Sequence, residues 1–183
     1  MNDTILSKEE LNLLASLVHA PIRQLVWDLD AIYFIQASRT IRVESFDGVP
    51  ATPNPVRNVE AVALRVSEIE ETPVFRSAGE DGHYYVVVDT NTRIESIAVV
   101  RTALCMPTEQ IVHPRRGCIG GTLTLCDCGI LIATARGFVP AVQRDNSFGF
   151  HLWGAPRLFS REEVEVELET DYETRALTSL ANA

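Results

Sequence analysis

The sequence predicts a mainly β fold: a single-domain antiparallel sheet, barrel-like or in two layers, with an N-terminal α-helix and a short C-terminal helix. Alternation of apolar and polar residues, which is typical of half-buried strands, runs through the body of the chain from about residue 22 to 170. A helical spacing of apolar residues is clearest at the N-terminus. The chain has 183 residues, 46% of them hydrophobic, so one domain with a sizeable core is expected.

The N-terminal helix is predicted over about residues 7–19. Ser7 and Glu10 have the spacing of a capping box, in which each side chain accepts a hydrogen bond from a backbone N–H at the start of the helix. Leucines and a valine then recur at helical spacing. Pro21 follows the helix and marks its end.

Three strand patterns follow this helix. Residues 23–30 and 40–46 alternate apolar and polar side chains, as half-exposed strands do, whereas 31–37 is apolar on both faces, as a central strand would be. The segment 49–58 holds three prolines. It is predicted to be a loop or an edge crossover, because proline cannot donate a hydrogen bond to a neighbouring strand.

The segment 58–71 fits two structures. Its apolar residues suit a helix capped by Asn58, and they suit a strand equally well. The valines favour the strand, because β-branched residues pack well on a pleated surface. A helix at this position, together with a helix at 160–181, would change the fold class from mainly β to α+β.

Two hairpins are predicted in the second half of the chain, separated by a loop at 110–121. Residues 83–104 are expected to form two strands around an Asp-Thr-Asn-Thr turn at 89–92. Residues 122–135 are expected to form two strands around an Asp-Cys-Gly turn, in which the glycine supplies a positive φ.

The C-terminal part is predicted to hold a strand and a helix. Apolar residues alternate with glutamates over 163–169, which predicts a strand with an acidic outer face. Ser160 and Glu163 also match a capping box, so a helix at this position is the alternative. Residues 171–181 are expected to form the short C-terminal helix.

The net charge of −9 narrows the range of partners. It disfavours binding to nucleic acid or to anionic membranes and favours a basic protein partner, while association into homo-oligomers is left open. The N-terminus lacks the pattern of a signal peptide, and no segment has the roughly 20 apolar residues of a membrane span. Four cysteines are too few for a disulfide scaffold. We therefore expect a cytoplasmic protein with reduced thiols.

Cys126 and Cys128 are the most distinctive cysteines. Residues two apart on a strand share a face, with Cα atoms roughly 6.6 Å apart, so two thiolates could bind one metal ion. A recognisable zinc site needs further ligands, and only a fold-back of the chain would bring Cys118 and His113 to the pair. Buried structural cysteines are therefore favoured over a metal site or a redox pair. Cys105 is expected to be a core residue at a strand end, and no cofactor is expected, zinc being the alternative.

The loop at 113–121 is the best candidate for ligand binding. His113, Arg115, Arg116 and Gly120 lie in it, and arginine side chains with glycine N–H groups suit a phosphate or carboxylate. The loop matches neither a P-loop nor a dinucleotide-binding fingerprint. The alternative is a surface loop whose arginines pair with the protein's own carboxylates.

The function predicted from these features is non-enzymatic binding. No catalytic motif occurs in the sequence, although catalysis by residues scattered along the chain stays open. Glu163, Glu165 and Glu167 are expected to form the docking face for a basic partner protein. The first alternative is a small-anion-binding protein or an enzyme that uses the 113–121 loop, with His113 as the acid–base group. The second alternative is a metal protein that uses Cys126 and Cys128.

Overall fold

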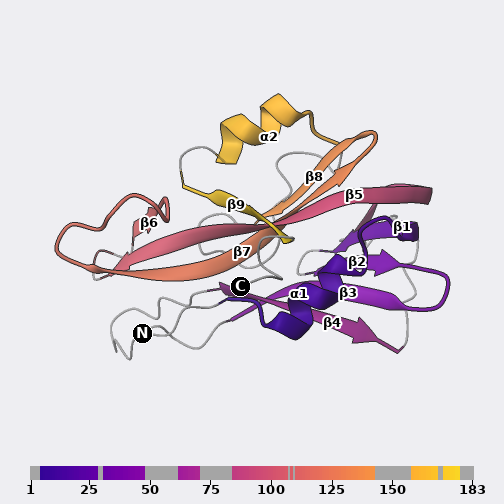
Figure 1. Cartoon of the computed structure of the whole chain (residues 1–183), viewed down its shortest axis with the longest axis horizontal. Helices are drawn as coiled ribbons and strands as arrows, with labels where there is room; N and C mark the ends of the chain where they lie inside the picture. The colour runs from indigo at the N-terminus through magenta and orange to yellow at the C-terminus, as the bar shows by residue number, and fades with distance from the viewer. Residues whose placement is uncertain are drawn as a thin grey trace.

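The fold is mainly β and antiparallel, as predicted (Figure 1). In the part of the chain that the computed structural model describes, nine strands form one open sheet and two helices pack on it. That part comprises residues 5–28, 31–47, 62–70, 84–106, 108, 110–142, 158–168 and 171–177.

The order of strands follows the chain closely. The sheet runs β4-β3-β2-β1-β5-β7-β8, and β6 and β9 pair with β5 along the edge opposite β7. The elements are α1 (Lys8–Ala15), β1 (Pro21–Asp28), β2 (Ala31–Ile35), β3 (Thr40–Asp47), β4 (Val62–Ile69), β5 (Tyr84–Met106), β6 (Gln110–Val112), β7 (Thr122–Thr134), β8 (Gly137–Val142), α2 (Arg161–Leu168) and β9 (Glu173–Ala176).

The first three strands and β4 confirm the sequence patterns. The pairing of β1 with β2, β2 with β3 and β3 with β4 is antiparallel throughout. The segment 58–71 is a strand over Val62–Ile69, as its valines indicated, and the predicted proline-rich loop at 49–58 lies outside the described residues.

Both predicted hairpin turns are wrong. β5 runs without a turn through 89–92, because its first part pairs with β1 and its second part pairs with β7. β7 likewise continues through Asp127–Gly129, and a register shift there leaves one extra residue on β7. The turn instead lies at 135–136, before β8. In both cases continuous pairing with neighbouring strands outweighs the local preference of Asp, Asn and Gly for turns.

The main core lies on one face of β5 and β7. The sheet curls so that β4 also contacts β7, and the space between is covered by Leu14 of α1 and by Leu17 just after the helix, both fully buried. A second apolar cluster lies on the other face of β5 and β7, beneath α2. Figure 1 accordingly shows α1 and α2 on opposite sides of the long β5–β7 ribbon.

The helix α1 begins where the capping box predicts. Ser7 is the N-cap, and its hydroxyl accepts the Glu10 N–H, while the Glu10 carboxylate accepts from the Ser7 backbone. The helix ends at Ala15, earlier than expected. His19 follows with a positive φ of 63° and donates its N–H to the carbonyl of Ile94 on β5, which draws the chain out of the helix and into the sheet.

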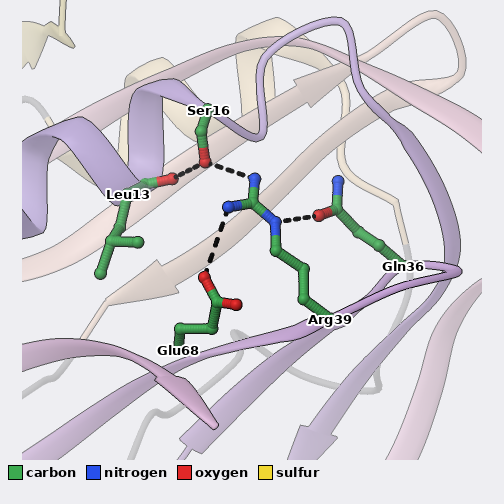
Figure 2. Close-up of polar contacts among 5 residues, drawn as sticks. All are labelled: Leu13, Ser16, Gln36, Arg39 and Glu68. Carbon is green, nitrogen blue, oxygen red and sulfur yellow. Dashed lines mark hydrogen bonds and ion pairs between the residues drawn. The ribbon is translucent and has the colours of Figure 1, made fainter. Parts of the chain in front are cut away.

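The end of α1 is held by Arg39 from the turn between β2 and β3 (Figure 2). The Arg39 guanidinium donates to Gln36 and to the Ser16 hydroxyl, each at 2.7 Å, and forms an ion pair with Glu68 of β4 at 3.4 Å. The Ser16 hydroxyl donates in turn to the Leu13 carbonyl. This cluster ties α1 to β3 and β4. Its groups are partly exposed to solvent, so its contribution to stability is small.

Glu10 is predicted to stabilise the fold beyond its role in the helix. Its second carboxylate oxygen accepts the backbone N–H of Val66 at 2.9 Å, and so satisfies a donor of β4. We expect Glu10→Ala to lower the free energy of unfolding by about 1–2 kcal/mol, because it removes a cap and leaves that N–H without its partner. Glu9→Ala is the matched control, since Glu9 is an exposed acid in the same helical turn. Equal urea midpoints for the two variants would contradict this role.

The C-terminal elements differ from the prediction. Residues 163–169 were expected as a strand, with a capped helix as the alternative; the helix forms instead, as α2, and Ser160 and Glu163 form its capping box. Residues 173–176, expected as helix, form strand β9, and residues 178–183 lie outside the described part. Val164 and Leu168 are four residues apart and both face the sheet. Their spacing is therefore that of the buried face of a helix, although the alternation with glutamates resembled a strand.

Candidate functional site

A pocket of about 430 Å³ lies between α2 and the sheet, and we call it the α2 pocket. Its position follows from the fold, because α2 crosses one face of the sheet while β9 and the 113–121 loop border it. Its lining divides into an apolar floor and a polar rim. The floor is formed by Leu131, Phe138, Val164, Leu168 and Tyr172.

The floor is well packed from behind. Val164, Leu168 and Tyr172 are buried and belong to the apolar cluster beneath α2. Leu131 of β7 and Phe138 of β8 pack against the same cluster but remain partly exposed. The apolar surface that they present is therefore open to a ligand while its support is rigid.

The rim carries two ion pairs, one of which joins distant parts of the chain. Arg115 Nε lies 3.1 Å from a carboxylate oxygen of Glu173 on β9, and Arg161 lies 3.6 Å from Glu165 one helical turn on. The Arg161 guanidinium also lies over the Phe138 ring, 5.3 Å from the ring centre. That stacking joins the charged rim to the apolar floor.

His113 completes the rim on the loop side. The backbone N–H of Arg115 donates to His113 Nδ1 at 3.2 Å, and the N–H of Arg116 donates to the His113 carbonyl at 2.8 Å. Because Nδ1 accepts a hydrogen bond, the neutral ring carries its proton on Nε2. His113 is therefore a hydrogen-bond donor at the border of the α2 pocket.

The structure brings only part of the predicted loop site into the pocket. His113 and Arg115 line it, whereas Arg116 and Gly120 do not and are exposed. Gly120 adopts a φ of 71°, a conformation that glycine adopts more readily than other residues, so the turn explains why a glycine lies here. Arg115 is paired with Glu173, as the surface-loop alternative predicted. Ligand binding by this loop stays a prediction.

Several lining residues were not singled out from the sequence. Arg161, Tyr172, Glu173 and Phe138 come from elements far from the loop, and only the fold brings them to it. The capping box at Ser160 was the one available signal, because a helix starting there places Arg161 in its first turn.

The strand on which Glu163, Glu165 and Glu167 were expected to share one face does not form, because Arg161–Leu168 is the helix α2. Docking of a basic partner by these glutamates stays a prediction. Glu163 serves in the capping box and Glu165 lines the α2 pocket in its ion pair with Arg161. The side chain of Glu167 lies outside the described residues.

Cys105 and Cys118 form a disulfide, which corrects the expectation of reduced thiols. Their Cα atoms are 5.6 Å apart, and Cys105 is buried at the end of β5, as expected of a core residue. The bond closes a loop that contains β6, His113 and Arg115, and so anchors one border of the α2 pocket. The cytoplasmic location stays a prediction, and the disulfide counts against it, because such bonds persist mainly in oxidising compartments.

Cys126 and Cys128 are buried thiols outside the disulfide, and they have separate surroundings. Cys126 packs with Leu104, whereas Cys128 lies in the cluster beneath α2 and is oriented toward the Val100 carbonyl at 3.5 Å. Among the described residues, no group of three or more His, Cys, Asp or Glu side chains is arranged to hold a metal ion. The zinc hypothesis therefore gains no further ligand from this part of the chain.

Burial raises the pKa of the Cys128 thiol far above its usual range, with smaller contributions from Cys126 and Asp127. Above the ordinary thiol pKa of about 8.5, the unfolded chain loses this proton while the folded chain keeps it, so the stability falls as the pH rises. Between pH 8 and pH 10 we expect a protein that keeps Cys128 to lose about 1–2 kcal/mol more stability than its Cys128→Ala variant.

Urea denaturation at the two pH values measures this difference. Both proteins carry Cys105→Ser and Cys118→Ser, so that disulfide exchange at high pH does not interfere. Parallel losses of stability in the two proteins would show that Cys128 ionises normally in the folded state.

Comparison with known proteins finds no matching family model, no similar curated protein and no similar solved structure. Within the described residues, neither helix has the length and apolar character needed to cross a membrane.

Proposed function

We propose that this protein is a non-enzymatic binding protein whose ligand is a small molecule held in the α2 pocket. The observation that supports it is the pocket's construction, an apolar floor under a charged rim. Small-molecule sites are typically clefts of about 300–1,000 Å³ with mostly apolar walls and a few polar groups that fix orientation. At about 430 Å³ the α2 pocket lies within that range.

The two parts of the lining suit different parts of one ligand. The floor offers the faces of Leu131 and Phe138 to an apolar body, and burial of that body would supply most of the binding free energy. The rim offers guanidinium, carboxylate and imidazole groups to a polar end. Both rim carboxylates already form ion pairs with arginines, and such paired groups suit recognition of the polar end of a ligand.

Two tryptophan substitutions on β9 test this proposal. Thr174 is exposed and lines the α2 pocket, so Thr174→Trp fills the opening without disturbing the core. Ala176→Trp is the matched control, because Ala176 is exposed two residues further along the same strand and does not line the pocket. Saturation-transfer NMR with small aromatic and aliphatic fragments is the measurement.

We expect fragments that bind the wild type to bind Ala176→Trp equally and Thr174→Trp at least about tenfold more weakly, because the indole occupies their place. If no fragment distinguished the two variants, the α2 pocket would not be the binding site and the proposed function would be wrong.

A further inference from the structure

The charges of the rim balance. The α2 pocket is lined by two arginines and two glutamates, and each arginine is paired with a glutamate. This inference rests on the proposed function. From the balance we infer that the ligand is a small apolar zwitterion, of the chemical class of an α-amino acid with an apolar side chain, and that a simple anion or cation of the same shape binds more weakly.

The Arg115–Glu173 pair shows why both charges of the ligand matter. The Arg115 side chain is 80% exposed, whereas that of Glu173 is only 17% exposed. Arg115 can therefore turn to a ligand carboxylate at small cost, because its guanidinium is well solvated in either position. Separating Glu173 from its partner costs more free energy, because a half-buried carboxylate without a cation is poorly solvated.

A ligand ammonium group resolves this conflict. It replaces the guanidinium at Glu173 while the ligand carboxylate accepts hydrogen bonds from Arg115, so every charge keeps an opposite neighbour. A simple anion would leave Glu173 unpaired. A simple cation would displace Arg115 from Glu173 and leave the Arg115 guanidinium without an anionic partner. The Arg161–Glu165 pair repeats the arrangement on the helix side, where both side chains are largely exposed.

The floor selects the remainder of the ligand. Phe138 and Leu131 offer a partly exposed apolar surface, and Tyr172 closes it from the β9 side. The Arg161 guanidinium over the Phe138 ring places a cation directly above that surface. An apolar side chain one or two bonds from the charged groups would therefore reach the floor while the charges stay at the rim.

Isothermal titration calorimetry on the full chain tests the inference with three compounds that share one apolar body. L-Phenylalanine carries both charges, 3-phenylpropionate lacks the ammonium group, and 2-phenylethylamine lacks the carboxylate. We expect L-phenylalanine to bind about tenfold more tightly than either, because each missing charge removes one charge-assisted contact.

A variant of Glu173 locates the ammonium site. Glu173→Gln keeps the shape of the side chain and removes its charge, so L-phenylalanine should lose its advantage over 3-phenylpropionate. Glu162→Gln is the matched control, because Glu162 is an exposed glutamate of α2 that does not line the α2 pocket. In this control the preference should stay unchanged.

The outcomes separate this inference from the proposed function. If 3-phenylpropionate or 2-phenylethylamine bound as tightly as L-phenylalanine, the preference for a zwitterion would be wrong, while binding in the pocket would stand. If none of the three compounds bound at millimolar concentration, the inference would likewise be overturned, and the Thr174→Trp and Ala176→Trp comparison would decide the proposed function on its own.

Discussion

Replacing Asp127 with alanine should lower the free energy of unfolding by about 3–5 kcal/mol. Asp127 of β7 and Arg101 of β5 form an ion pair in which Arg101 Nε donates to Oδ1 at 2.7 Å. Their side chains are only 3% and 8% exposed. Removing one partner leaves the other charge buried without compensation, which costs far more than losing a surface ion pair.

Asp127 has a second role that adds to this effect. Its other carboxylate oxygen accepts the backbone N–H of Leu6 at 2.9 Å, which fixes the segment before α1 against the sheet. Leu6 itself is buried in the main core. We therefore expect Asp127→Ala to loosen the chain before α1 as well, and hydrogen exchange of the Leu6 amide should be faster in the variant.

Urea denaturation of the single and double variants measures the pair. Arg101→Met combined with Asp127→Leu should recover much of the lost stability, because apolar replacements remove both buried charges together. Glu68→Ala is the control, since Glu68 pairs with Arg39 at a partly exposed site and its loss should cost less than about 1 kcal/mol. A loss of less than about 1 kcal/mol in Asp127→Ala would show that the pair is not buried as described.

The Cys105–Cys118 disulfide carries the second large effect. The two cysteines are 13 residues apart in the chain, and closing a loop of this size stabilises a protein by about 3 kcal/mol, by restricting the unfolded chain. The double variant Cys105→Ser/Cys118→Ser should be less stable by about that amount. Because the loop contains His113 and Arg115, hydrogen exchange at these two residues should also become faster than in the wild type.

The measurement is urea denaturation with and without dithiothreitol. The reductant should destabilise the wild type and leave the double variant unchanged, since that variant has no disulfide to reduce. If the double variant were as stable as the oxidised wild type, or if the reductant affected both proteins alike, the disulfide would not hold the loop in place.

The sequence predicted the sheet well where each strand pairs with the strands next to it in the chain. β1, β2 and β3 form a meander, and β2, whose sequence is apolar on both faces, is buried over its first four residues as a central strand should be. The two hairpin errors arose in the two longest strands, β5 with 23 residues and β7 with 13. β5 changes partner from β1 to β7 near Ile94, and no local pattern signals such an exchange.

The helix α2 shows the limit of periodicity. Val164 and Val166 suggested a strand, but only Val164 and Leu168 are buried, and Val166 is exposed. Residues four apart lie on the same face of a helix and also on the same face of a strand. The pattern of apolar residues alone therefore could not decide between the two structures. The capping box at Ser160 and Glu163 was the physically informative signal.

Only part of the candidate site could be predicted from the sequence. The chemistry of His113 and Arg115 is evident from the sequence because histidine, arginine and glycine are concentrated in one loop. Their partners were not predictable. Glu173 is 58 residues from Arg115 in the chain, and the pairing depends on β9 joining the edge of β5 beside the loop.

The most direct test of the central claim, that the α2 pocket binds a small ligand, is an amide NMR titration of the full chain with L-phenylalanine and, separately, with 3-phenylpropionate. We expect saturable shifts with at least one compound, concentrated at residues 113–116, 161–168 and 172–174, while residues around Arg39 stay unchanged. Saturable shifts centred elsewhere on the protein would contradict the account, whereas the absence of saturable shifts with either compound would overturn the zwitterion inference and leave the tryptophan comparison to decide whether the pocket binds a ligand.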